Sequence, residues 1–123
     1  MNLASVLWTS TILLVITAAG GLVMAGVAFK GNQPPTWLAM LHGFLAAAAL
    51  TLLLYAAATV GLPGMALTAL VLLLVAAAGG VVLNLKYHWK QLPLPRVIVI
   101  VHAVAAVAGF LLLLAATWAA RSL

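Results

Sequence analysis

The chain contains no Asp, no Glu and no Cys among its 123 residues. Without carboxylates it cannot build a Ser-His-Asp triad, a catalytic carboxylate pair, a carboxylate-held Mg²⁺ or Ca²⁺ site, or an acidic proton relay inside a membrane. Without cysteine it forms no disulfide, holds no thiolate-bound iron–sulfur cluster and attaches no c-type haem. Much of hydrolytic and all of thiolate chemistry is therefore excluded.

Charge is scarce as well, since only 4% of the residues are charged while 68% are hydrophobic. No water-soluble surface can be assembled from such a composition. A membrane-spanning helix needs roughly 20 mostly apolar residues. Four runs of this kind lie at about 3–29, 36–60, 64–85 and 97–119. We expect an integral membrane protein with no soluble domain.

The apolar runs are predicted to be helices. Open sheets leave unsatisfied backbone edges in lipid, and the runs lack the alternation of barrel strands. The predicted fold class is all-α, a transmembrane four-helix bundle that forms one membrane domain over 1–123. Short proline-containing connections separate the runs. They lie at 30–35, 61–64 and 86–96.

The few cations are unevenly distributed between the two ends of the predicted bundle. Lys30, Lys86, Lys90 and Arg96 lie in the first and third connections, and only Arg121 lies elsewhere. Cytoplasmic loops of membrane proteins carry an excess of Lys and Arg. The distribution predicts a multi-pass protein of the inner (plasma) membrane with both termini on the non-cytoplasmic side.

The sequence also predicts an internal repeat. When the chain is shifted by 60 residues, Lys, Pro and His each fall on a residue of the same type. These matches pair Lys30 with Lys90, Pro35 with Pro95, and His42 with His102. One residue out of this register, 18–21 matches 77–80 as Ala-Ala-Gly-Gly. We predict two tandem helix-hairpin repeats, about 3–60 and about 64–119, related by a pseudo-twofold axis along the membrane normal.

The duplicated His42 and His102 are the main candidate ligands. Each is predicted to lie roughly 10 Å below the cytoplasmic boundary, and twofold symmetry lets both imidazoles face the central axis. A metal ion bound by two histidines would hold their Cα atoms about 13 Å apart, which fits the roughly 11–14 Å diagonal of a four-helix bundle. We expect iron coordination through Nε2, with Nδ1–H donating to a backbone carbonyl one turn back, near Leu38 or Ile98.

Glycines and cations near the histidines extend this predicted site to a whole haem b. Glycines at similar depth on the other two helices would let a porphyrin approach the backbone. These are Gly20, Gly21, Gly79 and Gly80. The haem propionates need cations or donors, and such groups lie at the cytoplasmic end. They are Lys30, Lys86, His88, Lys90 and Arg96.

Each of these features also has an explanation without a cofactor. An intramembrane histidine can hydrogen-bond across a helix interface, and Gly-Gly pairs serve ordinary close packing. His88 has no partner in the repeat, which suits an interfacial anchor, and the cations satisfy the topology rule alone. A cofactor-free structural or assembly subunit is therefore the alternative, and quinone binding without haem is a third interpretation.

Through His42, His102 and the paired glycines, the chain resembles small b-type cytochromes of the four-helix membrane type. It is also similar to a group of uncharacterised four-span bacterial membrane proteins, through the stretches LHGFL at 41–45 and LNLKYHW at 83–89. Larger two-haem relatives use four axial histidines at two depths, whereas this chain has one duplicated pair.

The resemblance implies one haem b and electron transfer with the quinone pool or a partner redox protein, more than a stand-alone enzyme. It places the chain in a bacterial membrane. The expected partners are the lipid bilayer, a quinone, and a redox partner or a second copy of the chain, with no nucleic acid.

Overall fold

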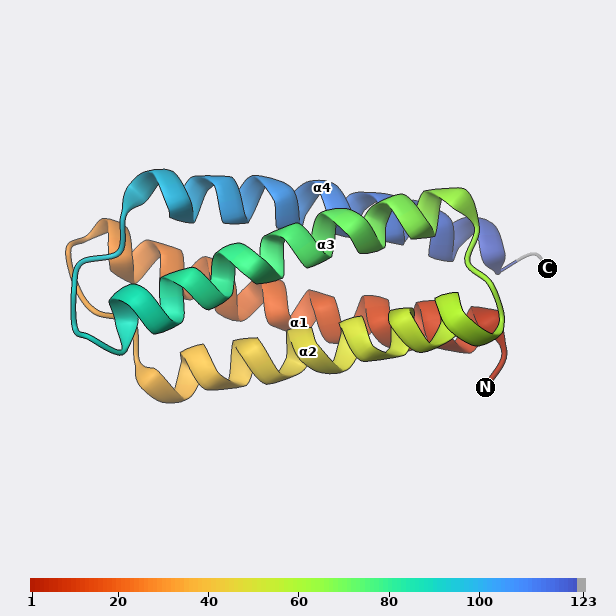
Figure 1. The fold of residues 1–123 in the computed structure, drawn as a ribbon, viewed down its shortest axis with the longest axis horizontal. Helices are drawn as coiled ribbons and strands as arrows, with labels where there is room; N and C mark the ends of the chain where they lie inside the picture. The colour runs from red at the N-terminus through yellow and green to blue at the C-terminus, as the bar shows by residue number, and fades with distance from the viewer. Residues whose placement is uncertain (122–123) are drawn as a thin grey trace.

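A computed structural model describes residues 1–121 as a bundle of four long helices (Figure 1). The helices are α1 (Leu3–Phe29), α2 (Thr36–Thr59), α3 (Gly64–Val82) and α4 (Arg96–Ala120), and a π-helical segment, η1 (Leu83–His88), continues α3. No strand occurs within residues 1–121. The four apolar helices, with η1 counted in the third, are each long enough to cross a membrane. The predicted all-α transmembrane bundle is confirmed.

The helix boundaries follow from proline and glycine. Each of the last three α-helices begins directly after a proline, namely Pro35, Pro63 and Pro95. Proline suits this place because its fixed φ is compatible with a helix start and it has no N–H to leave unbonded. After α1 and α2 the chain turns at Gly31 (φ 83°) and Gly61 (φ 87°), a left-handed conformation that glycine adopts without steric cost.

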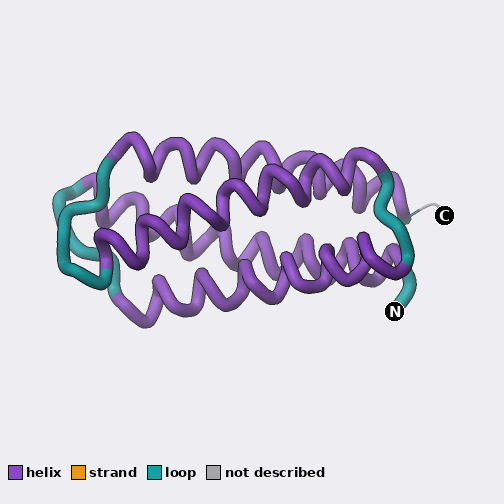
Figure 2. Tube along the Cα trace, viewed as in Figure 1, coloured by secondary structure: helices purple, strands orange, loops and turns teal. Residues whose placement is uncertain are grey.

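The helices pair as two hairpins. α1 packs mainly on α2 and α3 mainly on α4, with smaller contacts between α1 and α4 and between α2 and α3. This order leaves α2 and α4 on one diagonal of the bundle. The first and third connections lie together at one end, and the second connection lies with both described terminal segments at the other (Figure 2). We call these the loop end and the terminal end.

The third helix is longer than its apolar run predicts. The sequence suggests a loop from Lys86 to Arg96, but η1 continues the helix through His88, and Arg96 opens α4. In η1 the Trp89 N–H donates to the Asn84 carbonyl at 2.9 Å, which is an i to i+5 bond. The segment is polar but contains no helix breaker. Burial of His88 holds it in the bundle.

Most of the buried apolar core lies in the terminal half. It consists of Leu7, Leu14, Ala49, Leu50, Leu53, Ala66, Ala69, Leu70, Leu73, Leu113, Ala116 and Ala120. A buried hydroxyl pair joins the two hairpins there, with Thr11 Oγ1 2.9 Å from Thr117 Oγ1. Thr117 also donates to the Leu113 carbonyl at 2.8 Å. The loop half has few buried side chains, and His88 is one of them.

Candidate functional site

His42 on α2 and His102 on α4 lie close together across the diagonal of the bundle. Their ring centroids are 6.1 Å apart and the ring planes make an angle of 64°. Both side chains are half-buried. The structure therefore brings the two duplicated histidines into one site, with one ring supplied by each hairpin.

A backbone hydrogen bond fixes each imidazole within its own hairpin. His42 Nδ1 lies 2.8 Å from the Thr17 carbonyl of α1, and His102 Nδ1 lies 2.6 Å from the Ala76 carbonyl of α3. A carbonyl oxygen only accepts, so each Nδ1 carries the hydrogen and donates it. In the neutral ring this leaves the lone pair on Nε2, which is the form that binds a metal.

The expected position of these carbonyl acceptors was wrong. The sequence suggested carbonyls one turn back on the same helix, near Leu38 and Ile98, whereas both acceptors belong to the neighbouring helix. The physical reason is the close approach of the paired helices where glycine removes a side chain. The bonds join the two helices of each hairpin and add nothing within α2 or α4.

Gly21 and Gly80 make that approach possible. Each lies four residues after the residue whose carbonyl accepts the histidine bond. A Cβ on Gly21 would lie 2.9 Å from His42 Cε1, and a Cβ on Gly80 would lie 3.1 Å from His102 Cε1. Such distances are shorter than ordinary contact, so these two glycines provide the space that the imidazole rings occupy.

Gly20 and Gly79 have less crowded surroundings. A Cβ on Gly20 would be 3.5 Å from Leu38 Cδ1, and a Cβ on Gly79 would be 3.6 Å from His102 Cβ. Both are ordinary van der Waals distances. Of the four predicted glycines, the two that abut the imidazole ring atoms most closely are thus Gly21 and Gly80.

The predicted cations lie at the loop end. Lys30, Lys86, Lys90 and Arg96 are exposed, and the Arg96 guanidinium carbon lies 6.0 Å from the centre of the Phe29 ring. The chain has no acid to pair with them. No Asp or Glu side chain of this sequence can therefore pair with these cations.

His88 occupies a different environment from the one the sequence suggests. It is only 4% exposed, and its Nε2–H donates to the Pro34 carbonyl at 2.7 Å, so it is a buried link between two connections. Its Nδ1 is buried with no hydrogen-bond partner. The one N–H of the neutral ring is in use, so His88 does not supply a free donor for a propionate. The Pro34 backbone carbonyl that accepts this bond has no signature in the sequence.

The ligand set allows a test of which metal group the site fits. No group of three or more His, Cys, Asp or Glu comes together within residues 1–121. A structural zinc site needs four protein ligands and a catalytic one needs three, whereas a porphyrin supplies four nitrogens and leaves two axial positions to the protein. A metal bonded to both Nε2 atoms at ~2 Å would hold the ring centroids roughly 6 Å apart. The observed centroid distance of 6.1 Å matches this value.

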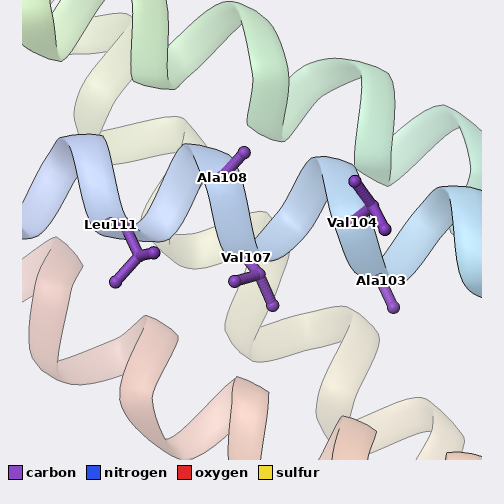
Figure 3. Close-up of a pocket in the computed structure, with 5 residues that line it drawn as sticks. All are labelled: Ala103, Val104, Val107, Ala108 and Leu111. Atoms are coloured by element: carbon purple, nitrogen blue, oxygen red, sulfur yellow. The ribbon is translucent and has the colours of Figure 1, made fainter.

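Two grooves on the bundle surface are lined mainly by apolar atoms. One runs along α4 and is lined by carbon atoms of Ala103, Val104, Val107, Ala108 and Leu111 (Figure 3). A second lies farther along the same helix, around Trp118. Neither has the few convergent polar groups that orient a small-molecule ligand. These grooves suit contact with lipid chains.

Comparison with protein-family models, curated proteins and solved structures found no match.

Proposed function

We propose that the protein is a membrane b-type cytochrome that holds one haem between His42 and His102. It would exchange electrons with the quinone pool or with a partner redox protein. The observation that carries this proposal is the pair of imidazoles at 6.1 Å, each with Nδ1 donating to a carbonyl and Nε2 available.

The protein's part in such a cytochrome is to fix the two ligands and their tautomer. The Thr17 and Ala76 carbonyls hold the rings by Nδ1, which also increases the basicity of Nε2. Haem iron supplies one-electron transfer when bound. Lys30, Lys86, Lys90 and Arg96 are the groups that would hold the propionates by charge.

A second function is favoured by the same contacts. Each imidazole already makes one hydrogen bond that ties its hairpin together, and Gly21 and Gly80 fit closely against the rings. These contacts also suit a cofactor-free subunit in which the histidines are structural. The two functions differ in whether Nε2 binds iron, and colour distinguishes them directly.

The proposal is tested by a reduced-minus-oxidised absorption spectrum of the full chain, produced with ample haem and purified in detergent. Two neutral imidazoles give a low-spin, six-coordinate b-type spectrum. His42→Gly or His102→Gly should abolish it, and added imidazole should restore it by filling the vacated position. Gly43→Ala, next to His42 but with open space at its Cβ, is the matched control. A colourless wild-type protein, or a spectrum unchanged in the double variant, would leave the structural function in its place.

We also propose the bacterial inner membrane as the location, with both termini on its outer side. The support is the set of four cations at the loop end against Arg121 at the terminal end. An alkaline phosphatase fused after Leu123 should be active because it folds only outside the cytoplasm. Activity of a cytoplasm-only reporter at the same site would reverse the orientation.

A further inference from the structure

Three buried side-chain atoms at the loop end have no hydrogen-bond partner. They are Gln33 Oε1, Asn84 Oδ1 and His88 Nδ1. All three are acceptors, because two are amide oxygens and the third is the ring nitrogen opposite the Nε2–H that donates to Pro34. Buried polar atoms are nearly always bonded, and no group of residues 1–121 bonds these three, so each can accept a hydrogen bond from a donor outside the chain.

The three acceptors belong to one neighbourhood. His88 bonds the Pro34 carbonyl at 2.7 Å, Gln33 directly precedes Pro34, and Asn84 lies four residues before His88 on η1. The first connection and η1, joined by the His88–Pro34 bond, thus carry all three acceptors at the loop end. Single π-helical turns inside α-helices occur frequently at functional sites, and η1 carries two of the three acceptors.

The charges around the three acceptors favour a neutral hydrogen-bond donor over a cationic one. Lys30 lies in the first connection and Lys86 in η1, which carry the acceptors; Lys90 follows η1, and Arg96 begins α4. Each is a cation and the chain has no acid, so an ammonium group or a metal ion would be repelled. A neutral donor carries no such cost.

We propose that Gln33, Asn84 and His88 form a binding site for a neutral hydroxyl group. Two sources share this chemistry, a resident water molecule and the headgroup of a lipid-soluble hydroquinone. If the hydroxyl group belongs to a hydroquinone, the site also identifies the electron-carrying partner of the proposed cytochrome. Only this choice of a hydroquinone rests on the proposed function.

The Gln33 side chain is held by one bond to the third connection. Gln33 Nε2 donates to the Leu92 carbonyl at 2.8 Å, in an exposed bond between the first and third connections. This bond occupies the Gln33 N–H group and leaves its Oε1 as an acceptor, while the His88–Pro34 bond holds η1 to the first connection. A headgroup at membrane-surface depth would reach Gln33, Asn84 and His88 from the loop face.

The site discriminates between the two redox forms of a quinone. A hydroquinone has two O–H donors, whereas the oxidised quinone has only carbonyl acceptors that would face other acceptors. We expect the reduced form to bind on the order of tenfold more tightly or better, since a mismatched buried acceptor loses its hydrogen bond.

The test uses full-length protein with ¹⁵N-labelled histidine in lipid nanodiscs, prepared without haem. The ¹⁵N resonance of His88 Nδ1 is followed during titration with decylubiquinol and, separately, with decylubiquinone. A saturable shift with the first and none with the second identifies a hydroquinone site. A magnetisation transfer from water to His88, with no response to either compound, identifies a resident water. If neither response occurs, the proposal is overturned.

Asn84→Leu removes one acceptor at similar volume and should weaken the response about tenfold. The same change at the exposed Asn32 of the first connection is the control and should leave the response unchanged. Gln33→Met is the second variant, to be used if Asn84→Leu does not fold. Wild-type binding in the folded variant would contradict the assignment. A colourless protein that still binds decylubiquinol would remove the haem proposal and leave this site intact.

Discussion

At the terminal end of the bundle, leucine and alanine side chains from all four helices are fully buried against one another, and the polar groups there bond within the protein. At the loop end His88 is buried, Gln33 and Asn84 are half-buried, and each of the three has one buried atom without a partner. The two ends of the same four helices therefore differ in how they are packed. The terminal half holds the hairpins together, and the loop half carries the groups that we propose as binding sites.

The largest effect should come from the terminal half. Leu53→Ala removes a side chain with 0% exposure and should lower the free energy of unfolding by about 2 kcal/mol. We expect the lower end of the usual range because lipid tails are as apolar as the protein interior, so the loss is mainly packing. Denaturation in mixed detergent–SDS micelles measures it. The neighbouring Leu54, 47% exposed, is the control and its change to Ala should have little effect.

A smaller loss is expected where glycine meets histidine. Gly21→Ala places a Cβ 2.9 Å from His42 Cε1, so the ring has to move off the Thr17 carbonyl, at a cost of about 1 kcal/mol or more. The ¹⁵N shift of His42 Nδ1 reports the broken bond. Gly43→Ala has open space and should leave that shift unchanged. An unchanged shift in Gly21→Ala would mean that the glycine does not position the ring.

The smallest effect should come from the hydroxyl pair between the hairpins. Thr11→Val keeps the shape but removes the bond to Thr117, at a cost of about 0.6 kcal/mol, typical of such bonds in membranes. Thr117 keeps its bond to the Leu113 carbonyl, which limits the loss. Thr51→Val, at an exposed threonine that bonds its own helix, serves as the reference. A loss as large as that of Leu53→Ala would show that the two hairpins depend on this contact.

Much of the fold could be predicted from composition, because lipid leaves a chain of this kind few options other than long helices. The pairing of His42 with His102 could also be expected, because the two residues occur at one repeat offset. The carbonyls that hold the rings could not, since backbone acceptors have no sequence signature. The unsatisfied acceptors of Gln33 and Asn84 depend on how two connections meet, which no local pattern encodes. The tandem repeat stays a prediction.

The π-helical segment offers an explanation for an irregularity in the sequence. The glycine pairs match at an offset of 59 residues, but Lys30 and Lys90, and the histidines after them, match at 60. The second half therefore contains one additional residue between Gly80 and Lys90, and η1 lies inside this interval. A π turn takes one residue more than an α turn, so it absorbs a single-residue insertion without breaking the helix. An insertion in the second hairpin only would then account for a difference between the two hairpins in their polar residues. His88 and Asn84 lie in the segment with the additional residue, and the first hairpin has Ala28 at the position that corresponds to His88.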